Sequence, residues 1–365
     1  MPVLEKIVIS DFRNIELQEL EFSPNINCIS GNNGEGKTNL LDAIHYLSMT
    51  KSAFATSDRF SFRHGQDEFS LLGTYKMENG ISSRFALKMN SKGEKKVRRD
   101  DKPYTRVSEH IGVLPIVMVS PSDISMVSES GDERRRFVNA VLSQMDAEYM
   151  AALQQYNRLL LQRNKMLKES DPDRSFMEVL DMRMAMLAQP IHEKRRNFVE
   201  SLKPIVSEYY AALSGGSEKV DIEYESDLFK GPLDQLLSAS FEKDRILKYT
   251  STGIQRDDFV FTMNGWPLRR HGSQGQQKSF LVSLKFAQYE IMKKNYGFAP
   301  LLLLDDVFDK LDMGRISNLL QMVSGSDFGQ IFITDSNKVR MSGIVDALTQ
   351  DRAYFETLSG TFKKI

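Results

Sequence analysis

The sequence predicts an α/β fold in which two distant segments of the chain complete one site around a large insertion. Three observations predict it. A Gly-rich octapeptide occupies residues 31–38, an aliphatic run at 301–304 ends in Asp305-Asp306, and the chain between them changes from alternating to helical periodicity. Because the two segments lie near opposite ends of the chain, the site must close around the insertion.

The Gly-rich octapeptide has the local context of a phosphate-binding loop. It matches the pattern G-x-x-x-x-G-K-[ST]. Residues 25–30 predict a buried strand before it, and aliphatic residues recur at helical spacing after it. Between a strand and a helix, backbone N–H groups converge on an anion. We therefore expect the phosphates of a nucleoside triphosphate to be bound by Gly31, Asn32, Asn33, Gly34, Glu35, Gly36, Lys37 and Thr38.

Four side chains are expected to have individual roles in this site. Lys37 would reach the β- and γ-phosphates as a catalytic residue, and the Thr38 hydroxyl would ligate Mg²⁺. Four leucines followed by two carboxylates are typical of a buried parallel strand that ends at an active site. We expect Asp305 to hold the Mg²⁺ and Asp306 to orient the attacking water as a general base. The alternative is an acidic strand end that simply faces solvent.

A second anion-binding cap is predicted at 271–278, directly before another helical run. A serine and glycines at a helix N-terminus can bind an anion. Because the chain already has one phosphate loop, we expect Ser273, Gly275 and Gln276 to contact the nucleotide of a second copy in a sandwich dimer. The strand at 330–335 and the acidic turn Leu311-Asp312 are the remaining segments expected beside the nucleotide.

Composition limits the class of protein. A chain of 365 residues exceeds the usual size of one hydrophobic core, so two lobes are expected. Its aliphatic runs are too short to span a bilayer, and residues 1–6 mix acid and base, unlike a signal peptide. Cys28 is the only cysteine, which excludes disulfides and cysteine-rich zinc sites. We expect a cytoplasmic protein without membrane contact.

The insertion contains two kinds of pattern. Between 69 and 119, alternating apolar residues and two glycine turns predict antiparallel strands, with Ile116, Val117 and Met118 among them. From 132 to 209 the apolar residues follow a helical period, interrupted at 170–173, which predicts a helical hairpin. The expected boundaries are 1–128 and 217–365 for the two parts of the nucleotide-binding head, and 129–216 for the helical insert.

Five short basic clusters interrupt an otherwise balanced chain. The formal net charge is −1, so nucleic-acid binding would need local patches rather than an overall positive charge. Contacts from such patches to phosphates would be salt-sensitive and independent of base sequence. For each cluster alone, an ordinary solvated face is the favoured interpretation. The clusters are 92–99, 134–136, 194–196, 269–270 and 293–294.

These motifs, in this order, resemble an ABC-type ATPase head of the SMC kind and, within that class, the RecF family of bacterial DNA-repair and replication proteins. The resemblance covers essentially the whole chain, and its most specific segment is Tyr156-Asn157-Arg158-x-Leu160-x-Gln162-Arg163-Asn164. The chain departs from the family pattern at Ser122, Gln255 and Phe54, where Glu, His and Arg are usual.

The resemblance implies an α/β ABC/SMC-type P-loop ATPase head with an antiparallel β lobe and an inserted α-helical hairpin domain. It implies ATP and Mg²⁺ as cofactors and an ATP-dependent homodimer that clamps duplex or gapped DNA regardless of sequence. It further implies slow, DNA-stimulated hydrolysis and loading of recombination machinery with RecR and RecO. Two other classes share the nucleotide motifs: the ATPase subunit of a transporter, and a structural SMC-like DNA-binding protein.

Overall fold

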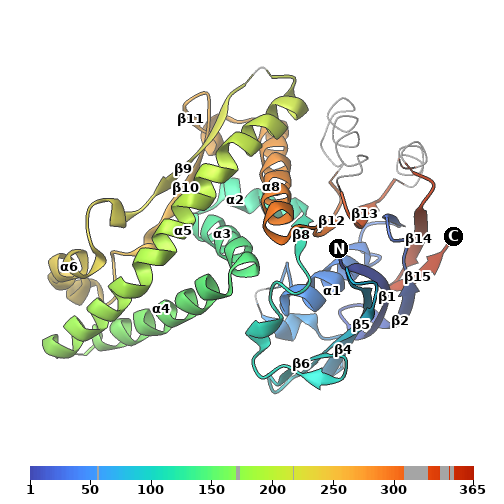
Figure 1. Ribbon diagram of the computed structural model, residues 1–365, viewed down its shortest axis with the longest axis horizontal. Helices are drawn as coiled ribbons and strands as arrows, with labels where there is room; N and C mark the ends of the chain where they lie inside the picture. The colour runs from blue at the N-terminus through green and yellow to red at the C-terminus, as the bar shows by residue number, and fades with distance from the viewer. Residues whose placement is uncertain (56, 170–172, 217, 308–327, 338–344, 346–348) are drawn as a thin grey trace. The chain divides into compact units, whose positions relative to one another are not determined.

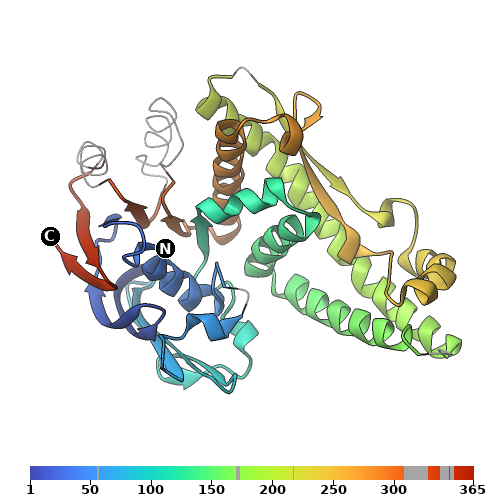
Figure 2. The ribbon, with the colours of Figure 1, turned by 180° about the vertical axis from the view of Figure 1, so that it is seen from behind.

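The chain folds into two compact units. The computed structural model describes residues 1–55, 57–169, 173–216, 218–307, 328–337, 345 and 349–365 (Figures 1 and 2). Unit 1 comprises Met1–Asp123, Ala212–Ser214 and Leu284–Ile365, and unit 2 comprises Ile124–Ala211 and Gly215–Ser283. The mixed content of helices and sheets agrees with the α/β class expected of an ABC/SMC-type ATPase.

A six-stranded, mainly parallel sheet forms the core of unit 1, in the order β15-β14-β3-β13-β12-β8. Every residue of β3, β8, β12 and β13 is buried, which is typical of parallel strands in a sheet covered on both faces. The strands predicted at 25–30, 301–304 and 330–335 are confirmed. The six strands are β3 (Ile26–Ser30), β8 (Ile116–Val119), β12 (Leu301–Leu304), β13 (Ile331–Asp335), β14 (Arg352–Leu358) and β15 (Thr361–Lys364).

The expectation that Ile116, Val117 and Met118 belong to the antiparallel lobe is wrong. They form β8, which pairs in parallel with β12 at the edge of the core sheet, with Val119 opposite Leu304. Four consecutive buried residues leave no polar face for solvent. Such a run therefore fits a sheet covered on both faces better than an antiparallel sheet with one face exposed to solvent.

A second, antiparallel sheet in unit 1 has the order β2-β1-β4-β5-β6-β7. Burial alternates along β4 and β5, so one face packs inward and the other meets solvent. Helix α1 (Lys37–Met49) contacts strands of both sheets and is buried over most of its surface for that reason. The strands are β1 (Val3–Phe12), β2 (Ile15–Glu21), β4 (Glu68–Lys76), β5 (Ser82–Asn90), β6 (Lys95–Arg99) and β7 (Lys102–Pro103).

Unit 2 is built on the helices α3, α4 and α5, of which α4 and α5 form the predicted hairpin (Figure 1). The Asp146 carboxylate accepts a hydrogen bond from the Tyr149 N–H and so begins α4 where α3 ends. Asp173 caps α5 in the same way. The helices are α2 (Ser125–Ser128), α3 (Gly131–Met145), α4 (Ala147–Met166), α5 (Arg174–Ser214), α6 (Leu233–Leu247), α7 (Leu268–His271) and α8 (Gln274–Tyr296), which continues into unit 1.

A three-stranded sheet, β11-β10-β9, also belongs to unit 2, so this unit extends past the insert expected at 129–216. Buried ion pairs join the two parts: Arg195 contacts Asp257 at 2.5 Å and Arg163 contacts Asp244 at 2.7 Å. The expected boundary rested on a change of periodicity in the sequence. Such a change does not show which distant segments pack together. The strands are β9 (Val220–Glu225), β10 (Asp258–Met263) and β11 (Trp266–Pro267).

Five short 3₁₀ helices connect these elements: η1 (Asp58–Ser61), η2 (Val107–His110), η3 (Pro121–Ile124), η4 (Asp227–Phe229) and η5 (Ile254–Arg256). Among the described helices, we find none that combines the length and the apolar character needed to cross a membrane.

Candidate functional site

The topology of the core sheet brings the sequence-predicted motifs of unit 1 to one edge. Strands β3, β8, β12 and β13 are parallel, so their carboxyl ends meet at the same side of the sheet. The Gly-rich loop follows β3, Asp305-Asp306 follows β12, and the turn 120–123 follows β8. This edge is where open parallel sheets bind their ligands.

The Gly-rich loop needs glycine for its backbone conformation and for space. Gly34 and Gly36 have φ angles of 88° and 112°, which side chains rarely adopt. A Cβ atom on Gly36 would lie 2.9 Å from the Asn14 amide, and one on Gly31 would lie 2.6 Å from the Thr357 methyl group. The loop is therefore confined on its outer side by residues from both ends of the chain.

Lys37 turns its side chain back onto the Gly-rich loop. Its side chain is buried, and its Nζ donates hydrogen bonds to the carbonyl oxygens of Gly31 (2.7 Å) and Asn32 (3.1 Å). Both acceptors are neutral. A buried ammonium held only by carbonyl dipoles of the loop is placed to exchange them for the oxygens of a bound anion.

Asp305 and Thr38 meet at the centre of the site. The Thr38 hydroxyl lies 3.0 Å from each carboxylate oxygen of Asp305, and the Thr334 hydroxyl donates to Oδ1 at 2.8 Å. Burial raises the pKa of Asp305 to about 6, and the nearby Asp306 adds to this, while the two threonine hydroxyls oppose it. A carboxylate kept out of water in this way is stabilised by a cation beside it.

The hydroxyl of Thr334 also connects the two carboxylate residues, a role that sequence reasoning missed. It accepts a hydrogen bond from the Asp306 N–H at 2.9 Å while it donates to Asp305. Asp306 has a φ angle of 43°, which is uncommon for a residue other than glycine and occurs often at functional sites. The available signal was the polar pair Thr334-Asp335 at the end of a buried apolar strand.

The second predicted cap belongs to unit 2, at the start of α8. The Gln276 N–H donates to Ser273 Oγ at 3.3 Å, and the Ser273 N–H donates to the Gln276 side-chain oxygen at 2.7 Å. This reciprocal pattern is a capping box. The Gln276 amide also donates to Glu218. Ser273 thus caps α8 and Gly275 lies in its first turn, while the Leu311-Asp312 turn lies outside the described residues.

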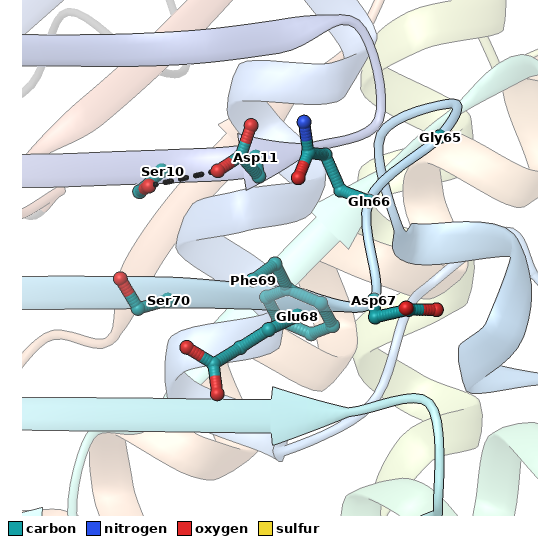
Figure 3. A pocket seen from close by; sticks show the side chains of 8 residues that line it. All are labelled: Ser10, Asp11, Gly65, Gln66, Asp67, Glu68, Phe69 and Ser70. Atoms are coloured by element: carbon teal, nitrogen blue, oxygen red, sulfur yellow. Dashed lines mark hydrogen bonds between the residues drawn. The ribbon is translucent and has the colours of Figure 1, made fainter.

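One cavity of about 320 Å³ lies at the antiparallel sheet of unit 1, apart from the predicted site residues (Figure 3). Its lining contains acidic and neutral side chains, and the Asp11 carboxylate accepts a hydrogen bond from Ser10 (Figure 3). A cavity without a basic side chain has nothing to neutralise phosphates. It is lined by Ser10, Asp11, Gly65, Gln66, Asp67, Glu68, Phe69 and Ser70.

The structure separates the basic clusters into two groups. In unit 2, Arg134 is held by both carboxylate oxygens of Asp258, at 2.8 and 2.9 Å, and Arg195 is buried against Asp257. These cations already have partners. On β6, Lys96 and Arg98 are exposed, and neither side chain has a partner within the described ranges. Arg98 lies opposite Ala86 of β5 and Lys96 lies opposite Lys88, on the face turned away from buried Val97.

The segment that carries the most specific family resemblance has a structural role in unit 2. The Arg163 side chain is fully buried and contacts Asp181 (2.6 Å), Asp244 (2.7 Å) and Thr250 (2.9 Å). Asn164 accepts two hydrogen bonds from Thr250, each at 2.7 Å. These contacts join α4 to α5 and to the segment after α6, which explains a motif without a nucleotide-binding role.

Comparison with known proteins identifies relatives along the whole chain. The family described as the RecF/RecN/SMC N terminal domain matches residues 3–352. The chain is 45% identical, over 98% of its own length and 98% of the relative's, to the DNA replication and repair protein RecF of Parabacteroides distasonis. It is 40% identical to the RecF of Bacteroides fragilis, over 100% of the chain and 98% of the relative.

Solved structures agree with these relatives. The chain superimposes with a TM-score of 0.90 on the structure titled recombination mediator protein RecF-ATP in the RecFOR pathway, at 29% identity, covering 100% of this chain and 98% of that one. It also resembles the Smc head domain of Pyrococcus furiosus, with a TM-score of 0.59 and 17% identity over 100% and 96% of the two chains. The second likeness concerns the fold alone.

Proposed function

This chain belongs to the RecF family of DNA replication and repair proteins, and from that premise we propose that it is an ATP-dependent DNA-binding protein of recombinational repair and replication restart. It acts in the cytoplasm as a dimer that closes on gapped or duplex DNA when ATP binds and reopens after slow hydrolysis. RecR and RecO are its partners in recombinase loading. The contact between Thr38 and Asp305 is the observation that carries the proposal.

The residues at this contact fit a nucleotide with its magnesium ion. A hydroxyl and a carboxylate within 3.0 Å of each other are oxygen ligands of the kind that Mg²⁺ prefers. The described residues contain no cluster of three or more His, Cys, Asp or Glu side chains able to hold a metal without help. This agrees with an ion that takes its remaining ligands from phosphates and water, as Mg²⁺ usually does.

Each side chain of the site then has its own role in hydrolysis. Lys37 neutralises the phosphates, Thr38 and Asp305 hold the metal, and Asp306 orients the attacking water. The bound ion supplies charge stabilisation for the departing phosphates. Thr334 positions both carboxylate residues, because it bonds to the Asp305 carboxylate and to the Asp306 N–H. The enzyme is a weak ATPase stimulated by DNA.

The dimer would be completed by the cap at the start of α8. Ser273 and Gly275 of one copy approach the nucleotide of the other, so that each ATP lies between two chains. The Ser273 oxygen is already oriented by the Gln276 N–H, and its hydroxyl proton is available to a phosphate. Lys96 and Arg98 on the outer face of β6 supply contacts to the DNA backbone, because they are exposed and have no acidic partner among the described residues.

The test is to measure ATPase rate and molar mass with and without gapped duplex DNA. We expect ATP to shift the chain from monomer to dimer, and gapped DNA to raise the ATPase rate by about tenfold. The Lys37→Arg variant serves as the control that binds nucleotide and hydrolyses it poorly. A transporter ATPase would not respond to DNA in this way, so a chain whose mass and ATPase rate are unchanged by DNA would contradict the proposal.

A further inference from the structure

Three hydrogen bonds converge on one carbonyl group of the Gly-rich loop, that of Glu35. They come from the Asn14 side-chain amide (3.3 Å), the Thr357 hydroxyl (3.1 Å) and the Gly360 N–H (2.8 Å). Asn14 lies in the turn between β1 and β2, Thr357 lies on β14, and Gly360 lies in the turn between β14 and β15. The Glu35 carboxylate accepts a further hydrogen bond from the Ser359 N–H.

The geometry of the peptide bond makes this carbonyl important for the nucleotide. The Glu35 C=O and the Gly36 N–H belong to one planar, trans peptide unit, so they point in opposite directions. Three donors that hold the carbonyl outward therefore hold the Gly36 N–H on the other side of the loop. There it joins the N–H groups that surround a phosphate at the beginning of a helix.

Close packing makes this arrangement rigid. A Cβ atom on Gly36 would lie 2.9 Å from the Asn14 amide, and a Cβ on Gly360 would lie 2.3 Å from the Asn14 carbonyl oxygen. Gly360 also has a φ angle of 81°. Asn14 is fixed in turn by the Asn39 side chain of α1, which donates to it at 2.7 Å. The packing of the loop, the β1–β2 turn and the β14–β15 turn therefore leaves no space for a side chain on Gly36 or Gly360.

The hairpin of β14 and β15 is itself firmly attached to the core of unit 1. β14 pairs in parallel with β3, the strand that leads into the loop, and Glu356 lies opposite Ser30. β15 pairs with β14, and its Phe362 N–H donates to the Gln18 side chain of β2. A contact that reaches the loop from this hairpin is thus held by two neighbouring elements.

We propose that Asn14, Thr357 and the Ser359-Gly360 turn are positioning residues of the ATP site, which set the Glu35–Gly36 peptide in its phosphate-binding orientation. The inference rests on the proposed function, because it assigns these residues to the same site. Bound phosphates fix the loop from inside, so nucleotide binding in turn stabilises the hairpin turn from which the Gly360 N–H donates.

The first experiment compares ATP binding by Thr357→Val, Thr357→Ser and a matched control, Thr361→Val. Valine has the shape of threonine without the hydroxyl, so we expect the Kd for ATP to rise about fivefold, as the loss of one hydrogen bond predicts. Serine restores the hydroxyl and should restore the Kd. The Thr361 side chain is exposed at the start of β15 and makes no hydrogen bond among the described residues, so its substitution should leave binding unchanged. The ATPase kcat at saturating ATP should stay within about twofold in all three.

The second experiment needs no substitution. Hydrogen exchange at the Gly360 amide is measured in the unsubstituted chain with and without ATP, and ATP should slow it at least about threefold. An unchanged Kd in Thr357→Val, or an unchanged exchange rate at Gly360 in a chain that binds ATP, would overturn the positioning role and leave the proposed function standing. A chain that binds no ATP would overturn both.

Discussion

The Thr38 hydroxyl lies 3.0 Å from each carboxylate oxygen of Asp305, although 267 positions separate the two residues in the chain. The contact exists because β3 and β12, which precede these residues, are both next to β13 in the core sheet. Thr334 at the end of β13 completes the cluster. Two segments far apart in the sequence therefore form a single cluster of two hydroxyl groups and a carboxylate.

Replacement of Asp305 by Asn should separate nucleotide binding from its metal dependence. The amide keeps the size of the side chain and a partner for the threonine hydroxyls, but it removes the charge that holds Mg²⁺. We expect the tighter ATP binding caused by Mg²⁺ to disappear and the ATPase rate to fall roughly 100-fold or more. Titrations of ATP with and without Mg²⁺ test this, and an Asn variant with undiminished Mg²⁺ dependence would refute the metal assignment.

The raised pKa of Asp305 predicts a characteristic dependence of stability on pH. Its pKa is about 6 in the folded chain against an ordinary 3.8, so the folded state holds the proton more tightly than the unfolded state does. The stabilisation is complete below about pH 3.8 and is lost as the pH rises through 6. A shift of this size corresponds to roughly 3 kcal/mol.

The measurement is the difference in unfolding free energy between the parent chain and Asp305→Asn from pH 4.5 to 7.5, without nucleotide or metal. Asn does not titrate, so the Asn variant should gain stability relative to the parent as the pH rises through 6. Subtraction removes the other titrating groups, which both chains share. A difference that does not vary with pH would show that the Asp305 pKa is not raised.

Ser273→Asp should abolish the ATP-induced dimer without loss of folding. Asp is as good a helix N-cap as Ser, so α8 should remain capped and the melting temperature of the monomer should stay close to that of the parent. Its negative charge would oppose the triphosphate of the other copy. Ser273→Asn, an uncharged cap, is the matched control. Light scattering with ATP gives the answer, and a dimer of undiminished stability in the Asp variant would exclude a contact to nucleotide in trans.

Lys96→Gln combined with Arg98→Gln should weaken DNA binding equally for every base sequence. Each lost phosphate contact reduces the steepness of the plot of log K against log salt concentration by about 0.9. The slope for the double variant should therefore be less steep by about two for each chain that contacts DNA. Fluorescence anisotropy over a series of salt concentrations measures this slope. The control removes two exposed charges elsewhere, with Arg183→Gln and Lys248→Gln, and the surface is misassigned if both double variants behave alike.

Arg163→Met should destabilise unit 2 and leave the nucleotide site intact. The substitution leaves the buried Asp181 and Asp244 carboxylates without their cation, at a cost of about 3–5 kcal/mol. Chemical denaturation should show this loss, while ATP affinity, measured well below the unfolding transition, should change less than about twofold. A loss of ATP affinity as large as the loss of unfolding free energy would indicate that the segment around Arg163 does take part in nucleotide binding.

Sequence patterns predicted the local parts of the site well and its long-range parts poorly. The strand before the Gly-rich loop and the helix after it depend on neighbouring residues, and both are confirmed. The carboxylate strand was recognisable because a run of four leucines must be buried on both faces. Alternation alone could not separate β8 from the antiparallel strands, because a run of four residues does not reveal its partner.

Other features could not be predicted, because they depend on contacts between distant residues. Arg134 belongs to a basic cluster that could have bound phosphates, but Asp258 neutralises this arginine from a strand more than a hundred positions away. The strand that contains Thr334 was expected beside the nucleotide, but no motif predicts the bonds of its hydroxyl to Asp305 and to the Asp306 N–H. The donors to the Glu35 carbonyl come from positions 14, 357 and 360, and no spacing rule connects them. Which residue becomes the partner of a charge or of a hydrogen-bonding group depends on the fold, and a short stretch of sequence does not show it.

The position of β3 between β13 and β14 has a consequence for the synthesis of the chain. β3 is among the first strands to leave the ribosome, but both of its neighbours in the sheet are made about 300 residues later. Until then, an apolar strand with two unpaired edges is exposed to aggregation. The site expected to bind ATP can therefore form only after β14 has been translated. In a chain truncated before β14, we expect a chaperone, and not ATP, to prevent aggregation.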